Sequence, residues 1–442
     1  MGRDAGMVGL VINDDEALAL LQPSNTSSVS AAVRLEGWFR QDTRFEYSHA
    51  AKLAREWTER CDQLARLLPR AGWRAGLTDE RSEACLGLYN QALERSHLLT
   101  TLAWSMANRT AALTSDILQQ LWGPPPTDLE YKAAVQQLHD RATKEADNTS
   151  ETVQRLATDL LAQLPTFQTV AQYRDQPRAE TVARFAGWVA EHLGFIRDYV
   201  EGQGFDPKVK LGSMSIAAAY REVLASAGYA SVDVLVGDYS SIMYKPSERR
   251  VCIPAGRQMT PGILIKNMGH ELIHIVRAIN GAQGLLDLGG LGTGAHLPFE
   301  EGLVASAEVL FQPNLEKLTI SYGKPDATVA IGLAFREGYD AVYKVMRLWH
   351  ALKAAALAAK KGEVDYRQTM ADAHDKAMTR LVRSCRGLSG GFRFANPRDL
   401  CYARGAEDFW RFMEQASEKD VARLLSAKVD LTDLVQYTYA ML

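Results

Sequence analysis

The sequence lacks most of the features that would place it in a specialised class of protein. Its 442 residues carry a formal net charge of -3, which gives no electrostatic reason to expect nucleic acid or an anionic membrane as a partner. No apolar run reaches the roughly 18 residues that a membrane helix needs. The first residues have neither the basic start nor the apolar core of a secretory signal. We therefore expect a soluble cytoplasmic protein.

Cysteine is scarce and scattered. The five residues are Cys61, Cys85, Cys252, Cys385 and Cys401, and no two form a C-x-x-C pair. This pattern argues against a disulfide framework and against a thiolate metal site, and it favours a reducing compartment. The glycine-rich run over 284–294 follows no strand and opens no βαβ unit, so it does not indicate a nucleotide site.

One short run carries most of the chemical information in the chain. His270, Glu271 and His274 form the pattern H-E-x-x-H within an apolar, helix-like stretch. Positions four apart lie on one face of a helix, one turn apart, so the two imidazoles can bind one metal ion. Glu271 lies about 100° round the helix, where it misses the ion but reaches a water molecule beside it. The pattern predicts a hydrolytic zinc site with Glu271 as general base.

The residues around this pattern favour a metal. Met268, Leu272, Ile275 and Ile279 form an apolar stripe, and further apolar residues flank the histidines. A helix that is buried on nearly every side needs partners for its polar groups, and a metal ion supplies them. The simpler alternative is a pair of core histidines satisfied by ordinary hydrogen bonds.

An acidic pair follows this run. Glu300 and Glu301 begin the sequence E-E-G-L just after Pro298, a favoured residue at a helix start. The helix dipole also favours carboxylates in a first turn, so capping alone is the alternative interpretation. The run resembles the third-ligand helix of gluzincin zinc peptidases, in which a glutamate before glycine binds zinc. That resemblance implies that Glu301 is the third ligand and Glu300 its neighbour. It also implies that Glu308, back on the same helix face, orients a ligand histidine.

Helical patterns dominate the rest of the chain. They cover residues 46–69, 80–121, 128–163, 178–203, 215–227, 326–360, 364–384, 398–416, 418–427 and 430–440. Residues 1–45 are mixed in character, and we expect them to form a loosely held arm.

Short β-rich runs lie between the helical patterns, at 232–236, 241–244 and 250–253. Two of them predict a hairpin, Ile242–Ile253, directly before the metal helix. It is a candidate for main-chain pairing with an extended peptide, and a purely structural sheet is the alternative. We expect a mainly α protein with a small antiparallel β-sheet. An N-terminal helical region (1–205) would precede a zincin-like metallopeptidase domain (206–442).

Four sequence blocks within residues 240–410 together resemble a known family. They are H-E-x-x-H at 270–274, R-A-I-N-G at 277–281, E-E-G-L at 300–303, and a final block of C-R-G at 385–387 with F-A-N-P-R-D-L-C-Y at 394–402, closed by Gly405. Their order and spacing resemble the microtubule-associated tyrosine carboxypeptidases and their bacterial relatives, the flavohaemoglobin-expression-modulating QEGLA-motif proteins. The family usually has H-E-x-x-x-H in the first block and lysine where this chain has Arg398. Neither departure removes a ligand.

The resemblance implies a carboxypeptidase that removes a C-terminal residue from a peptide or protein. One zinc ion would be held by His270, His274 and Glu301. Recognition of a terminal carboxylate needs a planar guanidinium, for which the resemblance nominates Arg386 or Arg398 as substrate-binding residues. Arg277, one turn past His274, is a further candidate from its position.

The resemblance also nominates Tyr402, whose phenol would act in catalysis by stabilising the oxyanion. Two other functions fit the same residues. One is a zinc endopeptidase or aminopeptidase, and the other is a non-catalytic regulatory protein with a structural metal. Retention of Glu271 argues against the regulatory protein, because a structural metal site does not need that carboxylate.

Overall fold

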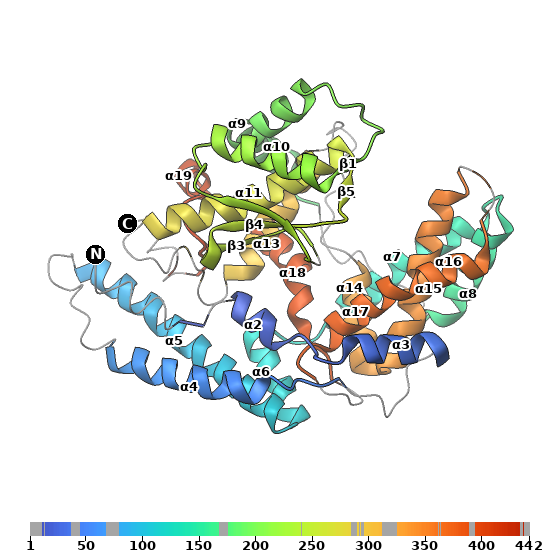
Figure 1. Cartoon of the computed structure of the whole chain (residues 1–442), viewed down its shortest axis with the longest axis horizontal. Helices are drawn as coiled ribbons and strands as arrows, with labels where there is room; N and C mark the ends of the chain where they lie inside the picture. The colour runs from blue at the N-terminus through green and yellow to red at the C-terminus, as the bar shows by residue number, and fades with distance from the viewer. Residues whose placement is uncertain are drawn as a thin grey trace.

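The computed structural model shows a mainly helical protein with two small β-sheets (Figure 1). It describes residues 11–12, 14–36, 45–67, 79–167, 176–239, 241–283, 290, 292, 296–311, 325–360, 362, 364–388, 394–433 and 436. Within these residues, no helix combines the length and the apolar character needed to cross a membrane. All five cysteines are buried, and none forms a disulfide.

The N-terminal half of the chain is built from helices of very different length. They are α2 (Asp14–Leu20), α3 (Thr26–Glu36), α4 (Ala50–Leu67), α5 (Asp79–Ala107), α6 (Ala111–Trp122), α7 (Asp128–Ala146), α8 (Glu151–Gln163) and α9 (Ala179–Gly202). Residues 14–36, expected to be a loose arm, instead form two packed helices, and Leu20 and Leu21 are fully buried. The expectation was wrong because it depended on the polar Ser and Thr residues of α3. The apolar residues between them, such as Val29 and Val33, face the core.

The strands and the remaining helices complete the chain. The strands are β1 (Leu211–Gly212), β2 (Asp233–Gly237), β3 (Met243–Lys245), β4 (Arg250–Pro254) and β5 (Gln258–Met259). The helices are α10 (Ser213–Ser226), α11 (Pro261–Gln283), α13 (His296–Leu310), α14 (Pro325–Arg336), α15 (Tyr339–Ala358), α16 (Tyr366–Asp372), α17 (His374–Cys385), α18 (Cys401–Gln415) and α19 (Glu418–Ala422), with 3-10 turns at Pro246–Glu248 and Pro397–Leu400.

Four of the helices expected from the sequence, those over 80–121, 128–163, 326–360 and 364–384, are each divided in two. Arg109 separates α5 from α6 with a positive φ of 56°, a conformation that ends a helix. Between α7 and α8 the side chain of Asn148 accepts a hydrogen bond from the Ser150 N–H, which competes with helical bonding. Gly338, with a φ of 97°, separates α14 from α15.

The main sheet is mixed, with strand order β2-β4-β3. The predicted hairpin is present, since β3 pairs antiparallel with β4 and Tyr244 lies opposite Val251. The expected small antiparallel sheet is present in the pairing of β3 with β4, and β2 adds a strand that pairs parallel with β4. This arrangement puts β3 at an edge of the sheet, where it meets α11. A separate two-stranded sheet, β1 with β5, is antiparallel.

The apolar residues form two cores. The first lies between the main sheet, α9, α10, α11, α13 and the second half of α18. The second joins α2–α4 and α6–α8 to α14, α15 and α17. Helix α5 contributes to both, through Cys85–Ala92 in the first core and Leu99–Met106 in the second.

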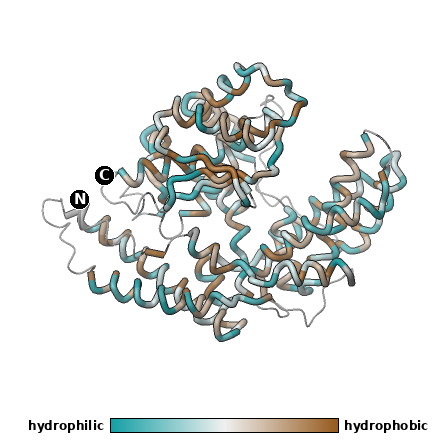
Figure 2. Tube along the Cα trace, viewed as in Figure 1, coloured by the Kyte–Doolittle hydropathy of each residue, from teal (hydrophilic) through white to brown (hydrophobic). Residues whose placement is uncertain are grey.

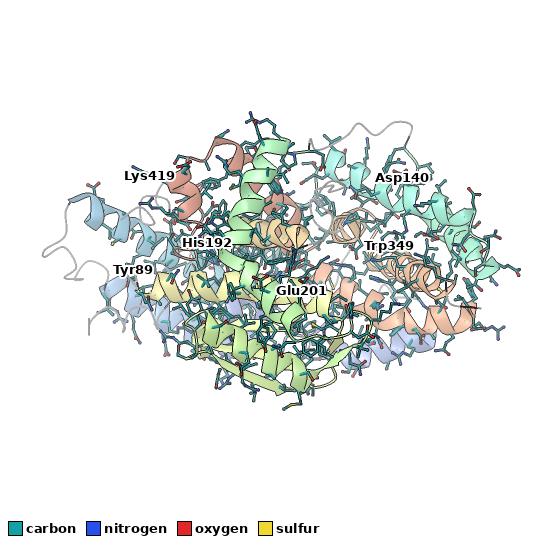
Figure 3. The ribbon with its side chains drawn as sticks, turned by 90° about the horizontal axis from the view of Figure 1, so that it is seen from above. Tyr89, Asp140, His192, Glu201, Trp349 and Lys419 are labelled. Carbon is teal, nitrogen blue, oxygen red and sulfur yellow. The ribbon has the colours of Figure 1, made fainter. Side chains whose placement is uncertain are left out.

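The expected boundary near residue 205 does not divide these cores. Helices α14–α17 lie late in the chain, yet they pack with the N-terminal helices, on the right of Figure 1. Figure 2 shows apolar residues gathered on the strands and alternating with polar ones along the helices. This alternation is expected where each helix buries one face. In the view of Figure 3, α9, which carries His192 and Glu201, runs across the middle of the molecule.

Candidate metal centre

Helix α11 carries the H-E-x-x-H pattern. It begins at Pro261, whose fixed φ suits the first position of a helix, and the Leu264 N–H donates to the Thr260 carbonyl at 2.9 Å. The apolar stripe predicted from the sequence faces the core, with Met268 and Leu272 both almost fully buried. The burial of this stripe fixes the rotation of the helix and turns the histidines towards α13.

The structure brings the three predicted ligands together. One ligand atom from each of His270, His274 and Glu301 lies within 4.8 Å of the others. The two imidazole rings lie one helical turn apart with their centroids 5.0 Å apart. Glu301 comes from the neighbouring helix α13, so the set joins two helices that are distant in sequence. The histidine side chains are 23% and 14% exposed, which leaves the cluster accessible from solvent.

The chemistry of these residues fits a metal ion. Oε2 of Glu301 is buried and has no hydrogen-bond partner among the described residues. A buried carboxylate oxygen without a partner is costly, and a cation is the natural partner for it. Nδ1 of each imidazole is already bonded to a carboxylate, which leaves Nε2 of each ring as the ligand atom. Two imidazoles and one carboxylate form a zinc donor set that leaves a fourth position open.

Each ligand histidine has its own carboxylate partner. Nδ1 of His270 donates to Glu308 at 2.5 Å, as the resemblance implied for a residue of that helix face. Nδ1 of His274 donates to Glu300 at 2.5 Å. The earlier histidine pairs with the later glutamate, so α11 and α13 run in opposite directions here. Such partners fix the ring orientation and its tautomer.

The protonation of His270 couples to metal binding. Burial lowers the pKa of this imidazole, but the hydrogen bond to Glu308 and the charges of Glu271 and Glu301 outweigh burial and raise its pKa to about 9 in the metal-free protein. A metal ion would bind only the neutral ring, so its binding at this site would release a proton.

Glu271 lies beside the cluster without joining it. Its Oε2 accepts a hydrogen bond from the backbone N–H of Tyr244, in edge strand β3, at 2.8 Å. Burial raises the pKa of this carboxyl and the charge of Glu301 raises it further, while the two histidines and the Tyr244 N–H lower it. The net shift is upward, as suits a group that accepts a proton and later returns it.

A crossing of two glycines joins α13 to α18. A Cβ added at Gly302 would lie 2.0 Å from the carbonyl oxygen of Gly405, and one added at Gly405 would lie 1.8 Å from that of Pro298. The two backbones are therefore in direct contact, which only glycine permits. These glycines belong to the E-E-G-L block and to the last block of the sequence, and their contact brings the start of α18 to Glu301.

Tyr402 lies in the first turn of α18, and the charge of a candidate ligand changes the pKa of its phenol. The charge of Glu301 raises the pKa of the Tyr402 phenol well above its ordinary value, and burial raises it further. The phenol therefore keeps its proton at neutral pH and can donate a hydrogen bond.

A cluster of arginines surrounds Asp399, close to Tyr402. Arg383 donates to both oxygens of Asp399, at 2.5 and 3.0 Å, and Arg380 bridges Asp399 and Asp326 at 3.2 Å each. Burial opposes the charged form of Asp399, but the arginines outweigh it and hold its pKa at about 2. This aspartate is therefore the anionic centre of the cluster.

The two arginines nominated for substrate binding lie in the same cluster. Arg398 is 8% exposed, and its Nη1 lies 3.9 Å from Oδ1 of Asp399. The Nε of Arg386 is buried without a hydrogen-bond partner among the described residues. Burial lowers the pKa of Arg386 to about 10, although the charge of Asp399 raises it, so the side chain stays charged at neutral pH. Arg386 is thus the better placed of the two for a further anion.

The third candidate for carboxylate recognition, Arg277, is excluded by its surroundings. Its side chain is fully buried, and it donates to Glu300 and to the carbonyls of Leu424 and Val429 at 3.2, 2.5 and 2.6 Å respectively. Its position one turn past His274 suggested access to substrate, but the C-terminal segment covers it. Arg277 has a structural role.

Sequence reasoning missed three contributors. Glu300 was interpreted only as a neighbour or cap, although it holds His274. Lys428 lies 3.3 Å from Glu300, and Asp399 organises the arginines. The two adjacent glutamates could have indicated that one binds the metal and the other binds a ligand histidine. The contact of Lys428 could not be predicted, because Lys428 lies more than 120 residues from the carboxylate that it contacts.

Comparisons with protein-family models, curated proteins and solved structures found no match to this chain. The resemblance described above therefore depends on the four sequence blocks. The zincin-like core and the division into an N-terminal helical region and a metallopeptidase domain both stay predictions.

Proposed function

We propose that this protein is a zinc metallopeptidase that acts as a carboxypeptidase on the C-terminus of a peptide or protein. The observation that carries the proposal is the convergence of His270, His274 and Glu301 beside Glu271, which takes no part in the cluster. A buried oxygen of Glu301 there has no hydrogen-bond partner within the described part of the chain. A purely structural metal site would not need Glu271. The other two features that support the proposal are Tyr402 and the arginine cluster.

His270, His274 and Glu301 would hold one zinc ion. When bound, zinc supplies a Lewis acid that polarises the scissile carbonyl and makes a water molecule more acidic. Glu308 and Glu300 would orient the two imidazoles, since each accepts the proton on Nδ1 and so directs Nε2 of its ring towards the ion.

Glu271 would move the proton in the reaction. Its Oε2 is held by the Tyr244 N–H, which leaves Oε1 to accept a proton from the attacking water. The water oxygen forms the new bond to the carbonyl carbon. As the C–N bond breaks, Glu271 passes the proton to the leaving nitrogen. Strand β3 fixes the base through a backbone donor and lies at the sheet edge, where an extended peptide could pair.

Tyr402 would stabilise the oxyanion, and Arg386 would recognise the substrate. The neutral phenol of Tyr402 is suited to donate to the carbonyl oxygen as negative charge develops there. The guanidinium of Arg386 is suited to bind a terminal carboxylate, because its Nε has no partner among the described residues and the surrounding cluster carries excess positive charge. This positive end is what favours a carboxypeptidase over an endopeptidase.

The decisive experiment compares the wild-type protein with Glu271→Gln, both loaded with zinc. Substrates are a peptide library with free or amidated C-termini, and with free or acetylated N-termini. We expect the wild type to release single residues from free C-termini only. We expect Glu271→Gln to bind zinc in the same stoichiometry and to cleave nothing, since the amide cannot accept the proton.

The other outcomes separate the alternatives. Equal cleavage of amidated peptides identifies an endopeptidase, and cleavage that acetylation of the N-terminus blocks identifies an aminopeptidase. If the zinc-loaded wild type cleaves no peptide, a regulatory protein with a structural metal is the better description.

A further inference from the structure

The segment after α19, residues 424–429, runs along the back of the helix that carries the histidines. Arg277 and Asn280 of α11 bind three of its carbonyls. The Arg277 guanidinium donates to Leu424 and Val429 as described above, and Nδ2 of Asn280 donates to Leu425 at 2.9 Å. This segment is therefore attached to the metal helix through its backbone, close to His274.

One side chain of this segment reaches the support of the metal centre. Nζ of Lys428 lies 3.3 Å from Oε1 of Glu300, the same oxygen that accepts the proton on Nδ1 of His274. Arg277 donates to the other oxygen, Oε2. Glu300 is fully buried, and Lys428 is only 12% exposed. Glu300 is thus held at both oxygens, by one cation on each.

The other ligand histidine has a different support. Glu308, the partner of His270, is 41% exposed, so water can solvate its charge. Glu300 has no such access and depends on its two cations to balance the cost of burial. Removal of one cation should therefore disturb the orientation of His274 far more than that of His270.

We propose that Lys428 is a positioning residue for the metal centre: it holds Glu300 in the orientation that directs His274 to the ion, and so couples the C-terminal segment to metal retention. The inference rests on the proposed metal site, and it adds a residue that does not touch the metal. Without Lys428, the bond to His274 is the one contact that Oε1 of Glu300 keeps among the described residues. The carboxylate can then turn fully towards Arg277, and the imidazole loses its fixed direction.

The test measures zinc affinity of the full chain by competition with a chromogenic chelator. We expect Lys428→Met to weaken zinc binding by about 10- to 100-fold, the usual effect of losing an indirect support of a ligand. Lys428→Arg keeps the charge and should stay within about 3-fold of wild type. The matched control is Lys419→Met in α19, which is exposed and lies at the edge of the molecule in Figure 3. It should not change affinity.

A second readout separates positioning from a loss of stability. The visible spectrum of the cobalt-substituted protein reports ligand geometry directly, and we expect Lys428→Met to change its band intensities while Lys419→Met does not. Urea unfolding of the metal-free variants measures stability by itself. If Lys428→Met lowers metal-free stability but keeps wild-type zinc affinity and cobalt spectrum, the role of Lys428 is structural and the proposal is overturned.

Two further outcomes are distinguishable. Should Lys428→Met fail to fold, Lys428→Gln, which keeps a polar end towards Glu300, is measured in the same way and is expected to weaken zinc binding. Wild-type affinity in that variant also overturns the proposal. If the wild-type chain itself does not bind zinc, the proposed function and this inference both fail. Zinc-dependent hydrolysis with an unchanged Lys428→Met affinity removes only the inference.

Discussion

Two groups of charged side chains lie near Tyr402, and their net charges have opposite signs. Around the candidate ligands, the carboxylates are Glu271, Glu300, Glu301 and Glu308, against the cations Arg277 and Lys428. In the neighbouring cluster, the cations are Arg380, Arg383, Arg386 and Arg398, against Asp326 and Asp399. The first region has an excess of negative charge and the second an excess of positive charge.

This difference suggests what each region binds. Buried or half-buried charges of one sign are costly unless a partner of the other sign is supplied. Within the part of the chain that the structure describes, a carboxylate oxygen in the first region and a guanidinium nitrogen in the second have no hydrogen-bond partner. The first suits a cation and the second an anion. A zinc ion would compensate the negative charge of the first region, and a peptide carboxylate would compensate the positive charge of the second. Substitutions can test two features of these regions: the contact between α13 and α18 that joins them, and their opposite net charges.

The largest effect is expected where the regions are joined. In Gly302→Ala, the added Cβ would lie 2.0 Å from a backbone carbonyl, so α13 and α18 must separate. We expect a loss of at least about 3 kcal/mol in the free energy of unfolding, or no folding at all, measured by urea denaturation. The matched control is Gly194→Ala in α9, where no atom of the described residues lies within 4 Å of the added Cβ. It should be neutral or stabilising by about 0.5–1 kcal/mol. A wild-type midpoint for Gly302→Ala would contradict the close crossing.

The next effect concerns the centre of the positive region. Asp399→Asn removes the charge that Arg380 and Arg383 share and leaves those cations buried without it. We expect a loss of about 3 kcal/mol in unfolding free energy. The control, Asp375→Asn, lies on the same helix as Arg383 but removes an exposed pair with Arg34. It should change stability by no more than about 0.5 kcal/mol.

The same pair of proteins gives a pH dependence. The pKa of Asp399 falls from 3.8 to about 2 on folding, because the arginines favour its charged form despite its burial. A lowered folded-state pKa stabilises above the unfolded value and loses its effect as the pH falls towards the folded value. The stability difference between wild type and Asp399→Asn should therefore be constant above about pH 5 and shrink between about pH 4 and 2. If the difference in unfolding free energy stays constant down to pH 2, the charge of Asp399 is not the source of the stabilisation.

A smaller effect is expected at the residue where the regions meet. Tyr402→Phe removes one O–H donor and leaves the ring in place. If the phenol stabilises the oxyanion, kcat should fall about 100-fold with little change in KM, and zinc affinity should be unchanged. A change in KM alone would instead make Tyr402 a substrate contact.

The smallest effect is expected for Arg386→Lys, which keeps the charge but loses the planar pair of donors. For peptides with a free C-terminus, kcat/KM should fall about tenfold. Arg367→Lys, an exposed change in α16, is the control and should leave the rate unchanged. Wild-type kcat/KM in Arg386→Lys would remove Arg386 as the carboxylate contact and leave Arg398.

Much of the candidate centre could be predicted because it depends on geometry within one helix. The spacing of His270 and His274, their separation from Glu271 and the burial of Met268 and Leu272 all follow from a period of 3.6 residues. The helix expected from residue 128 also begins there, as α7. Thr127 and Glu130 form its capping box, a contact across three residues.

Other features could not be predicted, because they depend on segments that meet only in the folded chain. The sequence determined that two histidines and a glutamate share a helix and that an acidic helix follows. The tertiary structure decided that Glu300, rather than solvent, holds His274, that Lys428 and Arg277 hold Glu300, and that Gly302 crosses Gly405. Local periodicity determines which side chains share a face, but only the packing of distant elements determines what that face meets.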